Sequence, residues 1–298
     1  MKPLAICLLY GVTATLMNIT NKFLIFTYEF SCTFIFMAAQ YMLSLGIYEV
    51  LRSKGMKTIP QISYQDALDT LPVTLCFLGS IVFGLSGMAY VNLPMYVALR
   101  KLSTLVVFLM EIGFSQKLPD KWSSLGICLI SLGALVAGSN DLTSDYFGFF
   151  LVFLANICTG LQLHLARLLK QKRKNLGALP QSYYNAMLGL PLVCILAYCT
   201  EEHISYSMHP YTGHLSFKIA LGLACLVGFF CNIAVFLCTT HNSPMATTIT
   251  GNMKDVVSML VGLFAFPDVE PTEAFVTGLF CSMLGAAVYS FGKIKNKT

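Results

Sequence analysis

Apolar stretches of about twenty residues, separated by short polar segments, recur along the whole chain of 298 residues. A helix of about 20 residues crosses the ~30 Å hydrocarbon layer of a bilayer. The pattern therefore predicts ten transmembrane helices, over residues 3–26, 30–51, 70–91, 95–115, 123–139, 146–169, 182–200, 217–239, 245–266 and 273–292. The first stretch contains Asn18, Asn21 and Lys22 and no small-residue cleavage site, so we interpret it as a helix and not as a signal peptide.

The connections between these stretches fall into two sets of opposite charge. The odd-numbered connections are acidic, with Glu29, Asp141, Asp145, Glu201, Glu202, Asp268 and Glu270. The even-numbered connections and both ends are basic, with Lys2, Arg52, Lys54, Lys57, Lys117, Lys121, Lys170, Lys172, Arg173, Lys174, Lys293, Lys295 and Lys297. By the positive-inside rule the basic set, including both termini, is cytosolic. The basic run at 170–174 serves as an orientation signal in this interpretation, with a lipid-headgroup or partner site as the alternative.

Composition supports a lipid environment. Hydrophobic residues make up 56% of the chain and charged residues 11%, whereas soluble domains carry roughly 25% charged residues. The eleven cysteines form no C-x-x-C pair, so neither a disulfide framework nor a zinc site is indicated. We expect the lipid bilayer as the surroundings, no metal or cofactor, and no nucleic-acid partner; a homodimer is left open.

An internal repeat relates the two halves of the chain. Asn92-Leu-Pro94-Met95 matches Asn242-Ser-Pro244-Met245. Residues 119, 126, 132, 133 and 134 recur with the same identities 152 positions later, as Pro271, Gly278, Leu284, Gly285 and Ala286. Because five helices is an odd number, the second half must enter the membrane inverted, which is a transporter architecture. The glycines of the matched helices are expected to serve close packing.

The sequence thus predicts an all-α polytopic membrane protein with ten transmembrane helices in two inverted five-helix repeats. We place the repeat boundary near residues 140–181. Residues 1–174 then hold the first repeat with the sixth helix and the basic cytosolic loop, and residues 175–298 hold the remaining helices. Together they form a single transporter domain.

Four cations lie inside the predicted spans: Lys22, Arg100, Lys101 and Lys254. Each costs ~2.5–3.5 kcal/mol at mid-bilayer on insertion scales. They favour a water-accessible path for an anionic solute such as a phosphate ester. The alternatives are pairing with Glu111, Asp255 or backbone carbonyls, and snorkelling of the first three to the membrane interface.

Two polar groups of residues suggest further site residues. Thr250, Gly251, Asn252 and Asp255 surround Lys254, and a polar, glycine-bearing helix at mid-membrane belongs against a cavity. Tyr183-Tyr184-Asn185 combines aromatic faces for stacking a base with an amide that can read hydrogen-bonding edges. A tyrosine pair at a span end is also typical of an interfacial aromatic belt.

At these residues the chain resembles the nucleotide-sugar transporters of the solute carrier 35 family, in the drug/metabolite transporter superfamily. The resemblance covers nearly the whole chain and is closest to the D-type branch, with GDP-mannose transporters as neighbours. It rests on Asn21-Lys22, the stretch from Asn92 to Lys101, Ser139-Asn-Asp-Leu142, Tyr183-Tyr184-Asn185-Ala186 and the stretch from Thr247 to Asp255.

The resemblance implies import of a UDP-sugar into the Golgi or endoplasmic reticulum lumen in exchange for nucleoside monophosphate. UDP-N-acetylglucosamine, UDP-N-acetylgalactosamine, UDP-glucuronate and UDP-glucose are the candidate substrates. It also implies that Tyr183, Tyr184 and Asn185 recognise the nucleotide, and that Gly251 to Asp255 replace the Gly-Ala-Leu-Asn-Lys motif of GDP-mannose transporters. Lys254 stands one position early and Ala186 replaces a second Asn, which favours UDP over GDP.

Four other functions compete with this one. A GDP-mannose transporter or a sugar-phosphate exchanger would use the same cations, and the latter would not need Tyr184 or Asn185. A non-transporting chaperone or receptor would have no use for costly intramembrane cations. Gly84-Leu-Ser86-Gly87 matches a short intramembrane-protease pattern, but His164 brings no partner motif, so we expect no enzyme.

Overall fold

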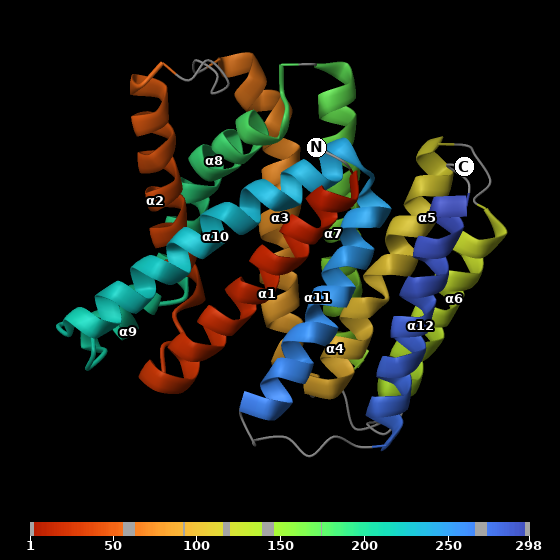
Figure 1. The fold of residues 1–298 in the computed structure, drawn as a ribbon. Helices are drawn as coiled ribbons and strands as arrows, with labels where there is room; N and C mark the ends of the chain where they lie inside the picture. Colours follow the sequence, from red (N-terminus) through yellow and green to blue (C-terminus); the bar gives the residue numbers. More distant parts are fainter. Residues whose placement is uncertain are drawn as a thin grey trace. The chain divides into compact units, whose positions relative to one another are not determined.

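The computed structural model describes residues 3–55, 63–91, 93–115, 120–138, 146–173, 175–265 and 273–295 (Figure 1). These residues form helices and connecting turns. The helices are α1 (Pro3–Tyr28), α2 (Thr33–Ser53), α3 (Tyr64–Met88), α4 (Leu93–Lys101), α5 (Ser103–Ser115), α6 (Lys121–Gly138), α7 (Tyr146–Lys172), α8 (Ala178–Cys199), α9 (Glu202–Met208), α10 (Leu215–His241), α11 (Pro244–Ala265) and α12 (Glu273–Lys295). The predicted all-helical class is therefore confirmed. Asn92, Pro119, Pro271 and residues 139–145 lie outside the described part.

Every predicted span overlaps a helix, but two details differ. The fourth span, predicted as one helix over 95–115, is divided into α4 and α5 at Leu102. The short helix α9 follows directly after α8, where a connection was expected. Among the described residues, α1, α2, α3, α7, α8 and α10 are long and apolar enough to cross a membrane. The chain is a multi-pass membrane protein, and the count of ten spans stays a prediction.

The chain folds into two compact units. Unit 1 comprises residues 1–75 and 166–242, and unit 2 comprises residues 76–165 and 243–298. Helices α3 and α7 continue from one unit into the other, so each unit combines segments from both ends of the chain. The units thus differ from the sequence division at residue 174, which concerned the repeat and stays a prediction.

In unit 1, helix α2 packs against both α8 and α10. Glycines on those two helices make room for its side chains. A Cβ atom added to Gly189 of α8 would lie 2.7 Å from the Tyr41 ring, and one added to Gly228 of α10 would overlap the Gln40 amide. Helix α1 packs along α10 through small side chains, including Ala14 and Ala234. Close helix contact at small residues replaces the hydrophobic driving force that is absent in lipid.

In unit 2, helices α6 and α12 pack at backbone contact. A Cβ atom added to Gly126 would lie 2.6 Å from the carbonyl oxygen of Gly285, and one added to Gly133 would lie 2.5 Å from that of Gly278. The predicted packing role of these glycines is therefore confirmed. The 152-residue shift relates Gly126 to Gly278 and Gly133 to Gly285, so the two contacts are one contact with the partners exchanged. A two-fold relation produces this kind of reciprocity.

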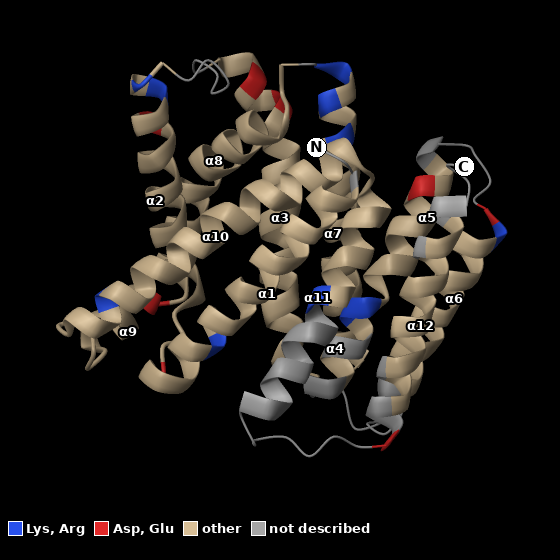
Figure 2. Cartoon of the chain, viewed as in Figure 1, with Lys and Arg blue, Asp and Glu red and all other residues tan. Residues whose placement is uncertain are grey.

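Charged residues lie mainly near the ends of the helices. Figure 2 shows long uncharged stretches between them, together with basic segments near the labels α4 and α11. The basic residues of α4 are Arg100 and Lys101, in its last turn. A charge within an apolar helix must be buried in protein or face water, so the end of α4 is the first place to look for a site.

Candidate functional site

The predicted site residues fall into both units. Unit 1 holds Asn21, Lys22, Tyr183, Tyr184 and Asn185, whereas unit 2 holds Arg100, Lys101, Thr250, Gly251, Asn252, Lys254 and Asp255. The predicted nucleotide motif and most of the predicted phosphate-binding cations therefore belong to different units. Each set is described within its own unit.

The centre of the unit 2 set is the break between α4 and α5. The Leu102 N–H donates to the Leu99 carbonyl at 3.1 Å, which tightens the last turn of α4, and the Leu105 N–H donates to the Leu102 carbonyl at 3.0 Å as α5 begins. Arg100 and Lys101 suit the partly negative C-terminal end of a helix. Ser103 and Thr104 favour a helix start. A broken helix exposes backbone polar groups, which membrane proteins tolerate beside a cavity or against protein.

Arg100 is held by polar side chains from α7. Its Nη1 group donates to Asn156 Oδ1 and to Thr159 Oγ1, both at 3.4 Å. The Asn156 Nδ2 group donates to the Leu99 carbonyl at 2.8 Å. Both acceptors of Arg100 are neutral, so these contacts leave the guanidinium charge in place.

Helix α11 contacts the same break through Asn252. Its Nδ2 group donates to Thr104 Oγ1, on a residue that is fully buried at the start of α5. Lys101 is 3% exposed, so it lies inside unit 2 and does not snorkel to the membrane interface. The structure therefore brings together Arg100, Lys101 and Asn252 from two predicted motifs.

The other predicted site residues of α11 make fewer contacts that define a role. Thr250 Oγ1 donates to the Ala246 carbonyl in its own helix at 2.8 Å. Gly251 and Lys254 are half-buried. The backbone of Asp255 is helical, and its side chain lies outside the described part of the chain.

In unit 1, the three residues of the predicted nucleotide motif are buried. Tyr183 is 2% exposed, and Tyr184 and Asn185 are fully buried. The Tyr183 hydroxyl donates to Glu49 at 3.3 Å, and Asn185 Nδ2 donates to the Tyr41 hydroxyl at 3.5 Å, both on α2. Asn185 Oδ1 receives no hydrogen bond from the described residues. The motif therefore joins α8 to α2, and a nucleotide would reach it only after a rearrangement.

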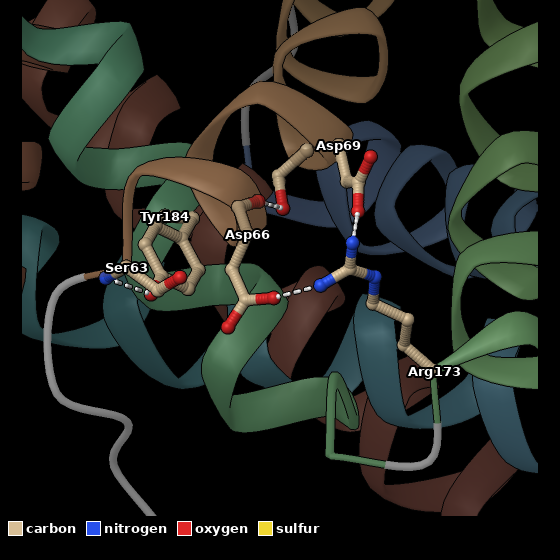
Figure 3. A network of polar contacts seen from close by, with 6 residues as sticks. Ser63, Asp66, Asp69, Arg173 and Tyr184 are labelled. Carbon is tan, nitrogen blue, oxygen red and sulfur yellow. Dashed lines mark hydrogen bonds and ion pairs between the residues drawn. The ribbon is translucent and has the colours of Figure 1, made fainter.

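Tyr184 also fixes the start of α3 (Figure 3). Its hydroxyl oxygen accepts the Ser63 N–H at 3.1 Å, and the Ala67 N–H donates to the Ser63 carbonyl at 3.0 Å. A helix start leaves its first N–H groups without intrahelical partners. The tyrosine from α8 supplies the partner that a capping side chain on the same helix often provides. Asp66, three residues after Ser63, is then free to turn elsewhere.

Asp66 and Asp69 turn toward Arg173, which follows α7 (Figure 3). Arg173 Nη1 lies 2.8 Å from Asp66 Oδ1, and Nη2 lies 2.7 Å from Asp69 Oδ2. The two carboxylates are three residues apart on one face of α3, near the positive end of the helix dipole. Arg173, a member of the basic run 170–174, is thus engaged within the protein, as is Lys170, whose Nζ group donates to the Thr240 carbonyl at 3.3 Å.

Asn21 and Lys22 are half-buried in α1. Asn21 Oδ1 is buried and receives no hydrogen bond from the described residues. Buried acceptors without a partner are uncommon, because burial removes their water. This oxygen marks Asn21 as a residue on which a ligand donor could act.

Sequence reasoning missed the residues that support these sites. Asn156 and Thr159 lie one helical turn apart in a largely apolar span, which was the available signal. Asp66 and Asp69 stand just before the predicted third span, where two carboxylates interrupt a connection otherwise assigned as basic. Both pairs need the fold to identify their cationic partners.

Comparison with known proteins identifies relatives along nearly the full length. The chain is 28% identical to UDP-sugar transporter sqv-7 of Caenorhabditis elegans, over 97% of this chain and 88% of that protein. It is 28% identical to nucleotide sugar transporter SLC35D2 of Mus musculus, over 95% and 87%. It is 21% identical to a GDP-mannose transporter of Aspergillus fumigatus, over 98% and 81%. These relatives are transporters, which confirms the prediction that the chain is not an enzyme.

No family model matches the chain. A crystal structure that is 15% identical superposes with a TM-score of 0.67 and covers 96% of this chain and 97% of its own, so the fold is shared along the full length. The chain is therefore similar over nearly its full length to nucleotide-sugar transporters, SLC35D-like members among them.

Proposed function

We propose that the chain is an antiporter that brings a UDP-sugar into the Golgi lumen in exchange for nucleoside monophosphate. The supporting observation is the group of Arg100, Lys101 and Asn252 at the break between α4 and α5. Two cations at a helix break, of which Arg100 is held by a neutral amide and a hydroxyl, suit the oxygens of a diphosphate. The membrane of the endoplasmic reticulum is the alternative location.

The proposed roles follow the chemistry of each side chain. Arg100 offers a planar fork to two phosphate oxygens, whereas Lys101 and Lys254 act as point charges. Asn252, Thr250, Gly251 and Asp255 line the path along α11. In this proposal these residues bind the phosphate groups of the substrate.

A second group of residues is assigned to the nucleoside. Tyr183, Tyr184 and Asn185 recognise the base, and Asn21 with Lys22 contribute from α1. The Oδ1 atoms of Asn185 and Asn21 support this role, because each is a buried acceptor that receives no hydrogen bond from the described residues. Tyr184→Phe is an unsuitable probe of base recognition, since it also removes the acceptor of the Ser63 N–H.

The substrates named for the relatives favour a uridine nucleotide over a guanosine nucleotide in the transported sugar. Sqv-7 is a UDP-sugar transporter, and relatives of Arabidopsis thaliana are named for UDP-galactose and UDP-glucose and for UDP-N-acetylglucosamine, at 28% and 27% identity. The GDP-mannose transporter is 21% identical. Transport by alternating access of two inverted five-helix repeats completes the proposal, and the reciprocal glycine contact of α6 and α12 supports the repeat.

Counterflow in reconstituted vesicles tests the function. Vesicles preloaded with UMP or GMP are offered labelled UDP-N-acetylglucosamine, UDP-N-acetylgalactosamine, UDP-glucuronate, UDP-glucose, GDP-mannose and hexose phosphates. We expect uptake of a UDP-sugar that depends on internal UMP. Uptake of GDP-mannose against GMP, or of a hexose phosphate alone, would replace the proposal with one of its rivals.

Two lysine variants control this experiment. Lys254→Ala should abolish uptake, whereas Lys218→Ala, which removes an exposed cation near the start of α10, should retain it. Folding of both is checked by size-exclusion chromatography, and light scattering in the same run reports whether the protein is a homodimer. Full uptake by folded Lys254→Ala would remove this lysine from the site.

A further inference from the structure

Asn156 lies on α7 with 2% of its surface exposed, against the last turn of α4. It makes two contacts there in opposite senses. Its Nδ2 group donates to the Leu99 carbonyl at 2.8 Å, and its Oδ1 atom accepts from Arg100 Nη1 at 3.4 Å. The short bond is to the backbone of the residue before Arg100. The amide therefore ties the guanidinium to the same turn that ends at the helix break.

An asparagine is the side chain that satisfies both contacts. Its donor and acceptor lie side by side on one planar group. The bond to the Leu99 carbonyl fixes which end is the donor, and this directs the oxygen toward Arg100. A leucine of similar size would lose both contacts, and an aspartate would repel the carbonyl while neutralising the arginine.

Thr159 completes the support one turn further along α7. Its hydroxyl donates to the Ala155 carbonyl at 2.9 Å, which leaves its oxygen directed to accept from Arg100 Nη1 at 3.4 Å. Both contacts to α7 thus use Nη1. The edge formed by Nε and Nη2 takes no part in them, and two parallel donors on such an edge match two oxygens of a phosphate.

We propose that Asn156, assisted by Thr159, is a positioning residue that holds Arg100 for the diphosphate of the substrate without neutralising its charge. The inference rests on the proposed function, because it assigns the support of one of its phosphate ligands. Carboxylate partners would hold the guanidinium more tightly but would compete with the phosphate for it. Two neutral acceptors with long bonds orient the arginine and leave its charge for the anion.

The test compares Asn156→Leu, Arg100→Gln and the double variant in counterflow and in binding. We expect Asn156→Leu to raise KM for the UDP-sugar about tenfold, since hydrogen bonds to charged groups have about that effect on affinity. Vmax should change less. In the Arg100→Gln background, Asn156→Leu should raise KM no further, because it acts through the arginine. Multiplying effects in the double variant would overturn the inference.

Thermal stabilisation of the purified protein by uridine, UMP and UDP gives a readout that does not depend on transport. The extra stabilisation that UMP and UDP give over uridine should shrink in Asn156→Leu and in Arg100→Gln alike. Asn156→Asp, which is nearly the same size, should lose it at least as fully, because a carboxylate neutralises Arg100. An Asn156→Asp protein that keeps normal UDP stabilisation would overturn the inference even if the leucine variant fails to fold.

A threonine pair supplies the matched control. Thr159→Val removes an acceptor of Arg100 and should raise KM. Thr240→Val removes a hydroxyl bond to the Phe236 carbonyl at 2.7 Å and leaves in place the Thr240 carbonyl, which accepts from Lys170, so its KM should not change. Equal KM values for the two would count against Thr159. If Arg100→Gln keeps a normal KM while UDP-sugar exchange persists, the positioning role is wrong and the function stands. If the wild-type protein neither binds UMP or UDP nor exchanges them, the proposed function itself is wrong.

Discussion

Arg173 illustrates how single residues stabilise this protein. It joins two carboxylates at the start of α3, of which Asp66 has 8% of its side chain exposed and Asp69 has 37%. A buried carboxylate without a cation is costly, whereas an exposed pair contributes little because water screens it. The contact of Arg173 with Asp66 is therefore worth more than the similar contact between Arg52 and Glu49, whose side chains are 36% and 46% exposed.

Replacing each arginine by glutamine tests this difference. Arg173→Gln should lower the free energy of unfolding by about 1–3 kcal/mol, because it leaves Asp66 without its cation. Arg52→Gln should cost roughly 0–1 kcal/mol, as exposed pairs do. Thermal unfolding in detergent, monitored by thiol labelling of the buried cysteines or by light scattering, measures the loss of stability in both variants. Equal losses would show that burial of Asp66 does not govern the contact.

A sequence can single out a candidate site residue where one position carries its own signal, and the assignment of these residues to a site stays a prediction. Arg100, Lys101 and Asn252 were selected because polar groups are costly in a span, and the fold brings them to one helix break. Asn156 was passed over, since an asparagine in an apolar helix does not reveal its partner. Its role depends on Leu99 and Arg100, which lie far away in the sequence.

Two features decide the arrangement of the helices in unit 2. The division of the fourth span at Leu102 lets α7 and α11 bond to the backbone and to Thr104 at the break. The second feature is the contact between α6 and α12, where glycines allow the two backbones to touch. Hydrophobic periodicity indicated the spans but not the break, because apolar residues resume beyond the polar pairs Arg100-Lys101 and Ser103-Thr104 that flank Leu102.

Alanine substitutions test the glycine contact. A Cβ atom at Gly285 would lie 2.6 Å from the carbonyl oxygen of Gly126 and 2.7 Å from the Ile130 nitrogen. Backbone cannot move aside as a side chain can, so Gly285→Ala should destabilise by about 1–3 kcal/mol. Gly222→Ala in α10 is the control, since nothing lies within 4 Å of its added Cβ. Thermal unfolding of both variants is measured, and an equal response would remove the packing explanation.

For the whole molecule, charge predicts orientation while the fold defines the compact units. The basic connections and both termini are assigned to the cytosol by the positive-inside rule. Unit 1 and unit 2 each draw on both ends of the chain, and α3 and α7 contribute to both. Orientation can be predicted because membrane insertion reads loop charge locally, whereas the membership of a unit depends on which helices pack together.

Glycosylation mapping tests the orientation. An Asn-Gly-Thr sequon on a Gly/Ser-rich linker is inserted after Gly213 or after Gly177, two connections where an added Cβ would meet nothing within 4 Å. The insertion after Gly213 should be glycosylated and the one after Gly177 should not, because only the former connection is assigned to the lumen. The shift in electrophoretic mobility before and after glycosidase treatment is the measurement. The reverse glycosylation pattern would show that the protein has the opposite orientation in the membrane.

The sequence by itself determined the membrane class, the approximate positions of the helices, the resemblance to nucleotide-sugar transporters and the costly cations. These follow from local properties, since a membrane-spanning helix must be apolar and of a fixed length. Each polar residue within it costs free energy and is therefore conspicuous. Only the tertiary structure decided that Tyr184 accepts the Ser63 N–H, that Arg173 pairs with Asp66 and that Asn156 holds Arg100. Such contacts join residues distant in sequence, and their geometry is set by helix packing that no local pattern encodes.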